Sequence, residues 1–275
     1  MVKVKKFIKI VIAVLLSVIT FFPLLWMFSN SFKSAENIIR RPLNLLPEFL
    51  DFRNFVGALN QAPFDLYIIN SIITGLLIVI LQLGTGILMG YGLSRFNFKG
   101  KKLLFWAVLL TYMLPAAATY VPSYVILSKM NLIDTLTGIV ISNAASVFTI
   151  YMVYQTFSAI PKEMIEAAEV DGANNWQILW RVMVPLSKST LLTTALIQFV
   201  AMYNNYMWPS LITNSKKNYL ISVGLNIFFN SRGNFTQNLP MLMAANTISV
   251  LPLLILFLVL QKYFIKGISD NEIKG

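Results

Sequence analysis

Four of the chain's eleven acidic residues, Glu163, Glu166, Glu169 and Asp171, fall within residues 161–185. Lys162 stands four residues before Glu166, a spacing that lets the two side chains pair on one face of a helix. The carboxylate of Glu166 could pair with or cap a group of a partner. The small residues Ala167 and Ala168 would let a partner's surface approach the backbone. This pattern predicts a docking element.

The rest of the sequence offers few residues of the types that usually perform catalysis. The 275 residues contain neither cysteine nor histidine. A disulfide, a thiolate metal site and a cysteine nucleophile are therefore excluded, as are the commonest metal ligand and general base. We expect no metal and no cofactor. The nearest approach to a phosphate-binding loop, Gly100-Lys101-Lys102, lacks the preceding glycine spacing and the hydroxyl. We therefore expect no ATP-binding site in this chain.

Local signals predict that the acidic segment folds as a helix, a turn and a second short helix. Pro161 suits the first helical position, and Glu163 favours the positive N-terminal end. Gly172 suits a left-handed cap, and Asn174 or Asn175 can cap the second helix. That second helix is predicted to present four side chains on one side: Trp176, Leu179, Trp180 and Met183. Pro185 precedes the turn into the next apolar segment.

Composition indicates the surroundings of this segment. Hydrophobic residues make up 57% of the chain and charged residues 12%, against about 25% charged residues in soluble domains. So few polar side chains cannot cover a globular surface. We therefore predict an all-α, polytopic membrane protein forming a single transmembrane domain over residues 1–275. Its six spanning helices would cover about residues 8–28, 67–93, 103–127, 136–157, 191–212 and 241–264.

Two of these spans carry an open question. Pro115 and Pro122 in the third span could mark a kink, a helix break beside a pathway, or merely a tolerated bend. The first span follows a basic N-terminus, as a signal peptide would, but its apolar run is longer than a typical signal sequence and no cleavage site follows it. We expect a retained helix.

The Lys and Arg residues near the helix ends predict the orientation. With the N-terminus inside, 14 of these residues fall on the cytoplasmic side and 8 outside. Both termini and residues 161–185 are then cytoplasmic, and the net charge of +11 reflects membrane edges rather than nucleic-acid binding. Residues 29–65 form a long external segment, with short helices expected. The polar residues 214–239 form another, with a turn at residues 231–234.

The acidic segment also resembles a known sequence motif. It is similar to the EAA motif, E-A-A-x3-G-x9-I-x-L-P, of binding-protein-dependent ABC importer permeases. The match is carried by Glu166, Ala167, Ala168, Gly172 and Pro185. Val182 and Val184 depart from the motif's Ile and Leu. The similarity extends through residues 206–209 (YMWP) and 261–267 (QKYFIKG). Within the carbohydrate-uptake family, it is strongest to the smaller permeases of maltose-type systems and to glycerol-phosphate permeases.

The resemblance implies a type I importer permease fold in a bacterial cytoplasmic membrane, with residues 161–180 as a helix that docks on an ATPase subunit. It assigns this coupling role to Glu163, Glu166, Ala167, Ala168, Asp171, Gly172, Ala173 and Pro185. The implied partners are ABC ATPase subunits, a second homologous permease, an extracellular solute-binding protein and the lipid bilayer. The resemblance also implies import rather than export, because the motif belongs to importers.

Neutral polar side chains inside the spans are candidates for contact with cargo, because such groups usually face protein or water. We single out Asn70, Thr74, Asn143, Asn204, Asn205, Tyr206, Trp208 and Asn246. Amides and aromatic rings suit a sugar. The alternative for each is a hydrogen bond between helices, worth about 0.6 kcal/mol on average. Tyr206 and Trp208 could equally be interface anchors.

Three other functions compete with sugar import by an ABC permease. A glycerol 3-phosphate permease would need a cationic site, and no Lys or Arg lies deep in a predicted span. A secondary carrier acting alone usually shows inverted repeats or buried ionisable groups, and neither is visible. A membrane enzyme would lack a histidine, a cysteine or a paired intramembrane carboxylate.

Overall fold

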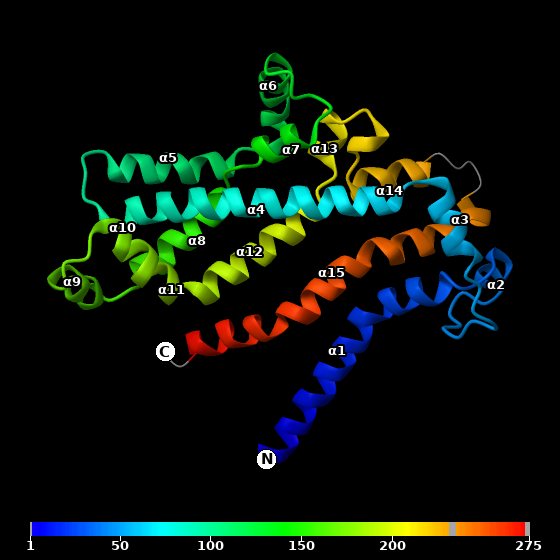
Figure 1. The fold of residues 1–275 in the computed structure, drawn as a ribbon. Coiled ribbons are helices and arrows are strands. Elements are labelled where there is room, and N and C mark those ends of the chain that lie inside the picture. The colour runs from blue at the N-terminus through cyan, green and yellow to red at the C-terminus, as the bar shows by residue number, and fades with distance from the viewer. Residues whose placement is uncertain (1, 231–234, 273–275) are drawn as a thin grey trace. The chain divides into compact units, whose positions relative to one another are not determined.

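The computed structural model describes the backbone of residues 2–230 and 235–272, so the turn predicted at residues 231–234 lies outside the described part of the chain. Within those ranges every regular element is helical, which confirms the all-α prediction (Figure 1). The chain divides into two compact units. One comprises Met1–Ile68 and Gly224–Leu254, and the other Ile69–Val223 and Ile255–Gly275. The single domain over residues 1–275 stays a prediction.

The first unit begins with the long apolar helix α1 (Val2–Asn30), in which an 18-residue apolar stretch has no buried residue. Two short helices follow, α2 (Ala35–Arg40) and α3 (Arg53–Gln61), as expected for residues 29–65. The unit also contains the start of α4 (Phe64–Arg95), most of α14 (Ile221–Asn230) and much of α15 (Phe235–Glu272). The ring of Phe64 packs edge-on against Phe228 at a centroid distance of 5.1 Å, which joins the start of α4 to α14.

The second unit contains the rest of α4 and the helices that follow it. These are α5 (Lys101–Met113), α6 (Ala116–Lys129), α7 (Leu136–Ser142), α8 (Val147–Ser158), α9 (Lys162–Val170), α10 (Asn175–Gln177), the π-helix η1 (Ile178–Met183), α11 (Val184–Leu186), α12 (Lys188–Tyr203), α13 (Met207–Ile212) and the 3₁₀ turn η2 (Lys216–Asn218). Helix α8 packs against both α5 and α12 (Figure 1).

By length and composition, the described helices supply three membrane crossings, or up to six if each bent pair counts as one crossing. Three are single helices, Lys5–Asn30, Phe64–Arg95 and Gln237–Val259. The other three are pairs bent at a short break: Lys101–Tyr112 with Ala116–Lys129 (99°), Leu136–Ser142 with Val147–Ser158 (45°), and Asn175–Leu186 with Lys188–Tyr203 (76°). The upper number agrees with the six predicted spans, but the last pair begins at Asn175, within the acidic segment, and not at the start of the span expected over 191–212.

One of these three breaks, and a further interruption between α12 and α13, have local causes. Leu114 adopts an extended conformation and ends α5, because proline disfavours helical geometry in the residue before it and Pro115 has no N–H to donate. Pro122, by contrast, is accommodated inside α6. The helix expected over 191–212 is also interrupted, since α12 ends at Tyr203 and α13 begins at Met207. There the side-chain amide of Asn204 donates to the carbonyl of Val200 at 2.9 Å, a local bond that competes with helix continuation.

Glycines bring α4 close to α8. A Cβ atom built on Gly86 would lie 2.7 Å from Cγ2 of Thr149, and one on Gly90 would lie 2.7 Å from Cγ1 of Val153. Larger residues at these two positions would push the helices apart. The close approach places the C-terminal end of α4 beside the end of α8, where the acidic segment begins.

Asp134 holds together the loop before α7 and the residues after α13. Its φ is +55°, a left-handed conformation that aspartate tolerates better than most residues. Its carboxylate accepts hydrogen bonds from the backbone N–H groups of Asn214 (2.9 Å) and Ser215 (3.0 Å), and from the Ser215 hydroxyl. The Asn218 amide donates to it as well, at 3.2 Å.

Candidate functional site

The acidic segment folds as a helical hairpin, which we define as residues 161–186. Its first arm, α9, begins at Lys162, one residue later than predicted, with Pro161 as its N-cap. Glu163 lies in the first turn, where the partial positive charge of the helix end favours an acid. Among the side chains that the structure describes, no ion pair joins Lys162 to Glu166. The pairing predicted from their spacing is therefore wrong.

Gly172 reverses the chain between the two arms. Its φ is +82°, as predicted for a left-handed cap. The N–H of Gly172 donates to the carbonyl of Glu169, and the N–H of Ala173 donates to the carbonyl of Ala168, both at 3.0 Å. These two bonds form a Schellman motif, which satisfies carbonyls that the end of α9 would leave free.

Asn174, one of the two candidate caps, starts the second arm. Its side chain accepts from the N–H of Gln177 at 2.9 Å, and the Gln177 side chain accepts from the N–H of Asn174 at 2.8 Å. This reciprocal pair is a capping box. The chain then winds through η1 and α11 and reaches Ser187, where it turns into α12.

The four side chains predicted on one side of the second arm divide between two sides. Leu179 and Met183 are buried, each 1% exposed, whereas Trp176 and Trp180 are 61% and 42% exposed. The two tryptophan rings pack edge-on at 5.7 Å. The π-helix η1 turns Ile178, Leu179 and Met183 into the core and leaves Trp176 and Trp180 outside it.

A compact apolar core anchors both arms. Ile165 of α9 and three residues of η1, Ile178, Leu179 and Met183, are buried in it. The other members come from α4, α8 and α12: Ile87, Tyr91, Val153, Phe157 and Leu191. Ala168 and Ala173 are half-buried against the same core. The hairpin is therefore fixed to three long helices of its unit by buried side chains.

The outer side of the hairpin is open. Of the predicted coupling residues, Glu163, Glu166, Ala167, Asp171 and Gly172 are exposed around α9 and the turn. Val170, beside them, is 88% exposed. Pro185 is exposed too, but it lies in α11 at the far end of the second arm. The structure thus brings the first five together on one small surface and separates Pro185 from it.

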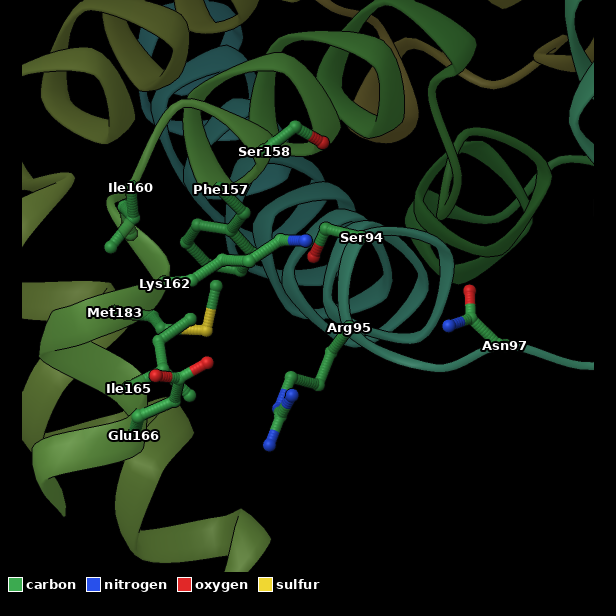
Figure 2. A pocket seen from close by; sticks show the side chains of 10 residues that line it. All are labelled: Ser94, Arg95, Asn97, Phe157, Ser158, Ile160, Lys162, Ile165, Glu166 and Met183. Atoms are coloured by element: carbon green, nitrogen blue, oxygen red, sulfur yellow. The ribbon is translucent and has the colours of Figure 1, made fainter. Parts of the chain in front are cut away.

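A pocket of about 360 Å³ lies between the end of α4 and the first arm. Figure 2 shows Ser94, Arg95 and Asn97 on the α4 side, and Lys162, Ile165 and Glu166 on the α9 side. Phe157, Ser158, Ile160 and Met183 complete the lining.

Two polar contacts with α4 were not expected from the sequence. Arg95 forms an ion pair with Glu169 of α9, and the Tyr91 hydroxyl donates to the carbonyl of Asn175 at 3.0 Å. The only sequence signals were the basic charge of Arg95 at a helix end and the acidic charge of Glu169. Their separation by 74 residues in the chain hides the pairing.

The residues predicted to contact cargo lie in different environments. Asn70, Thr74 and Trp208 are buried, with 5%, 1% and 5% exposure. The Asn70 amide donates to the carbonyls of Lys217 and Tyr219. The Thr74 hydroxyl donates to the carbonyl of Asn70 at 2.7 Å, and the Trp208 indole donates to the Ser142 hydroxyl at 2.8 Å. These three side chains make bonds within the protein.

The other predicted cargo residues of the second unit lie at helix interruptions. Asn143 is the C-cap of α7, and Asn204, Asn205 and Tyr206 fill the gap between α12 and α13. Asn204 is exposed and the other three are half-buried. Asn246, in α15, belongs to the first unit and donates to the carbonyl of Leu242 at 2.8 Å.

Hydrogen bonds from α4 and α12 hold the break between α7 and α8. The Gln82 amide donates to the carbonyl of Asn143 at 2.9 Å, and the Thr85 hydroxyl donates to that of Ala144 at 3.2 Å. The Gln198 amide donates to the hydroxyls of Ser146 and, at 3.1 Å, of Thr149. Carbonyls freed by a helix break inside a membrane need such partners.

Known transport proteins are similar to this chain over most of its length. The arabinooligosaccharides transport system permease protein AraQ of Bacillus subtilis is 29% identical, over 95% of this chain and 93% of AraQ. The sn-glycerol-3-phosphate transport system permease protein UgpE of Yersinia pestis is 30% identical, over 91% of each chain. A chain in the crystal structure of a bacterial ABC transporter that imports the acidic polysaccharide alginate superposes with a TM-score of 0.83, at 25% identity, covering 95% of this chain and 97% of that one.

The sequence pattern of one protein family matches residues 82–270, which include the end of α4, the whole hairpin and all three bent pairs. That family is described as the binding-protein-dependent transport system inner membrane component. The match and the structural likeness confirm the predicted importer permease fold, the permease function and the multi-pass membrane location. The chain belongs to the family of binding-protein-dependent transport system inner membrane components.

Proposed function

We propose that this chain forms half of the translocation path of an ATP-driven importer for a sugar or oligosaccharide. An extracellular binding protein delivers the solute, a second homologous permease forms the other half of the path, and separate ATPase subunits supply the energy. The observation that carries the proposal is the hairpin, because its outer side is open while its inner side is held in a buried core. Such an element can transmit movement from a partner to spanning helices.

The orientation follows from the charges at the helix ends. The excess of Lys and Arg on one side of the spans, 14 against 8, supports cytoplasmic termini. The hairpin then faces the cytoplasm, where an ATPase subunit can reach it. Residues 29–65 and 214–239 face the outside, where a binding protein delivers its cargo.

The docking surface is centred on Glu166 and Gly172. Glu166 is exposed and makes no ion pair within the described chain, so its carboxylate is free to pair with a cation of the ATPase. Ala167 and the sharp turn at Gly172 let the partner come close to the backbone. Exposed Val170 adds apolar area to the same surface.

The path for the cargo runs past the helix interruptions. Irregular backbone at membrane depth is tolerated where it is buried in protein or lines a water-filled cavity. Asn143, Asn204, Asn205 and Tyr206 lie at such places and are partly or fully accessible, so they are our candidates for cargo contact. Asn70 and Trp208 are assigned instead to hydrogen bonds with other segments of the chain, and Thr74 to a hydrogen bond within α4.

Two substitutions test the docking role. Glu166→Lys reverses the free charge, and Gly172→Pro cannot adopt the φ of +82°. Each is expected to abolish uptake and to prevent co-purification of the ATPase while the chain remains inserted in the membrane. Asp65→Lys changes an exposed acid in the first turn of α4 and is the matched charge control. It should retain uptake and co-purification of the ATPase. Normal uptake in both hairpin variants would defeat the proposal.

The relatives suggest a second cargo, because one of those described above is a glycerol 3-phosphate permease. The two cargoes differ in charge, and no Lys or Arg lies deep in a predicted span. We expect the cognate binding protein to bind neutral oligosaccharides in a calorimetric titration and to show no heat with glycerol 3-phosphate. The reverse result would assign the phosphate ester.

A further inference from the structure

We infer that Arg95 and Tyr91, near the end of α4, are positioning residues that make α4 a third route by which movement of the hairpin reaches the spanning helices. The chain itself connects the hairpin to two helices only, α8 through residues 159–161 and α12 through Ser187. The inference rests on the proposed docking of the hairpin on an ATPase subunit and adds a route that the chain connectivity does not supply.

The two contacts hold both arms of the hairpin. Arg95 pairs with Glu169 in the first arm, before the turn at Gly172. The Tyr91 hydroxyl donates to the carbonyl of Asn175 at 3.0 Å and lies 3.3 Å from its Oδ1, in the second arm. Because Tyr91 and Arg95 are four residues apart, they lie on one face of α4. Movement of either arm therefore pulls on the same side of one helix.

Packing supports the polar contacts. Tyr91 is 6% exposed and lies in the same core as Ile165, so the ring that carries the hydroxyl is itself held in place. Gly90 brings α4 against α8 beside it. Closer to the first turn of α9, the pocket shown in Figure 2 separates the two helices. Arg95 lines this pocket and reaches past it to Glu169 near the end of α9.

The exposure of the ion pair suits a role in transmitting movement to α4 better than a role in stabilising the fold. The side chains of Arg95 and Glu169 are 28% and 44% exposed, and ion pairs this accessible contribute little to stability. Reversal of the pair should therefore leave folding intact while changing how hairpin movement reaches α4. Arg40 and Glu36 of α2 form a similar pair at 2.7 Å, with exposures of 75% and 67%, outside the hairpin.

The test uses the assembled importer in proteoliposomes and measures the number of solute molecules transported per ATP hydrolysed. Arg95→Glu and Glu169→Arg alone should each lower this ratio at least about fivefold, the lower end of usual coupling energies between sites. The combined exchange should restore it to within about twofold of the unaltered importer. The corresponding exchange of Glu36 and Arg40, singly or together, should leave the ratio unchanged.

Milder variants cover the case in which a reversed charge prevents assembly. Glu169→Gln keeps the shape of the side chain and Tyr91→Phe removes only the hydroxyl, and each should lower the same ratio while the ATPase still co-purifies. An unchanged ratio in both variants, or failure of the double exchange to restore an assembled importer, would overturn the inference. Loss of ATPase binding in Glu166→Lys tests the docking role separately, so the two ideas can fail independently.

Discussion

At the scale of single residues, Asp134 shows how one carboxylate can join two segments. Burial raises the pKa of Asp134, but hydrogen bonds from Ser215, Asn214 and Asn218 outweigh it and hold the pKa well below its usual range. A lowered pKa in the folded state means that the ionised form stabilises the fold. That stabilisation is complete above the unfolded-state pKa of about 4 and is lost as the pH falls toward the folded-state value.

Asp134→Ala should lower the free energy of unfolding by about 1–2 kcal/mol at pH 7, because two backbone N–H groups and a hydroxyl lose their acceptor. Thermal unfolding of the purified protein would measure the loss. The difference from the unaltered protein should shrink as the pH falls below about 4, because the carboxylate of the unfolded chain then takes up a proton while that of the folded chain stays ionised. Asp65→Ala, whose carboxylate is exposed, is the control and should show no such difference. An equal difference at pH 7 and pH 3.5 would contradict the assignment.

Substitutions at Gly172 and Gly100 can separate the effect of backbone strain from the effect on docking. Both have positive φ, +82° and +89°, and a Cβ at either position would meet no atom within 4 Å. An alanine at either site therefore costs about 1 kcal/mol of backbone strain and no clash. Uptake should fall strongly in Gly172→Ala and little in Gly100→Ala, with equal amounts of both variants in the membrane. Equal uptake by the two would mean that the turn is structural alone.

At the scale of elements, the contact between α4 and α8 depends on glycine. Gly90→Leu should separate the two helices, since even a Cβ there would lie 2.7 Å from Val153 Cγ1 and 3.1 Å from the backbone nitrogen of Tyr154. Overpacking of this kind typically costs about 1–3 kcal/mol. Gly92→Leu, two residues further along α4, is the matched control, because a Cβ atom there would meet no atom within 4 Å. The midpoint of thermal unfolding should fall in the first variant and stay unchanged in the second.

The sequence predicts some elements better than others. Apolar runs locate the unbroken helices: the span expected over 67–93 appears within α4, Phe64–Arg95. The break at Pro115 is readable in part, because proline restricts the residue before it. The break after Tyr203 carries no comparable signal, since asparagine is also common inside membrane proteins as an interhelical partner.

In the hairpin, too, the features set by neighbouring residues could be predicted from the sequence, and those set by distant residues could not. Gly172 and Asn174 act through bonds to residues within five positions, so their roles follow from the sequence. The ion pair of Arg95 with Glu169 and the π-helical winding of residues 178–183 depend on packing against α4 and α8. No pattern in the hairpin's own sequence specifies them, and the expected placement of Trp176 and Trp180 was wrong for that reason.

At the scale of the whole molecule, the absence of cysteine makes the orientation directly testable. Val170→Cys places one thiol on the hairpin, where Val170 is 88% exposed, and Leu46→Cys places one in the external segment, where Leu46 is 78% exposed. A membrane-impermeant thiol reagent added to intact cells should label only the second variant. The first should become labelled after the membrane is permeabilised. Labelling of Val170→Cys in intact cells would place the hairpin outside and reverse the orientation.

The exposed apolar surface of α1 bears on assembly at the same scale. An 18-residue stretch of this helix has no residue buried within the chain, although its mean hydropathy is 2.6. Lipid or a neighbouring subunit must therefore cover it. Crosslinking from single cysteines along α1 to the second permease in the assembled importer would distinguish the two, and uniform labelling by lipid-soluble probes alone would favour lipid.

The π-helix η1 gives the second arm a property of its own. Its wide turn, closed by the N–H of Val184 donating to the carbonyl of Leu179, holds one residue more than an α-helical turn would. If residues 178–183 rewound as an α-helix, everything before them would rotate by about 100° and shift by about 1.5 Å relative to α12. A local change of winding would thus rotate the docking surface about the axis of the second arm, without any change in the loops.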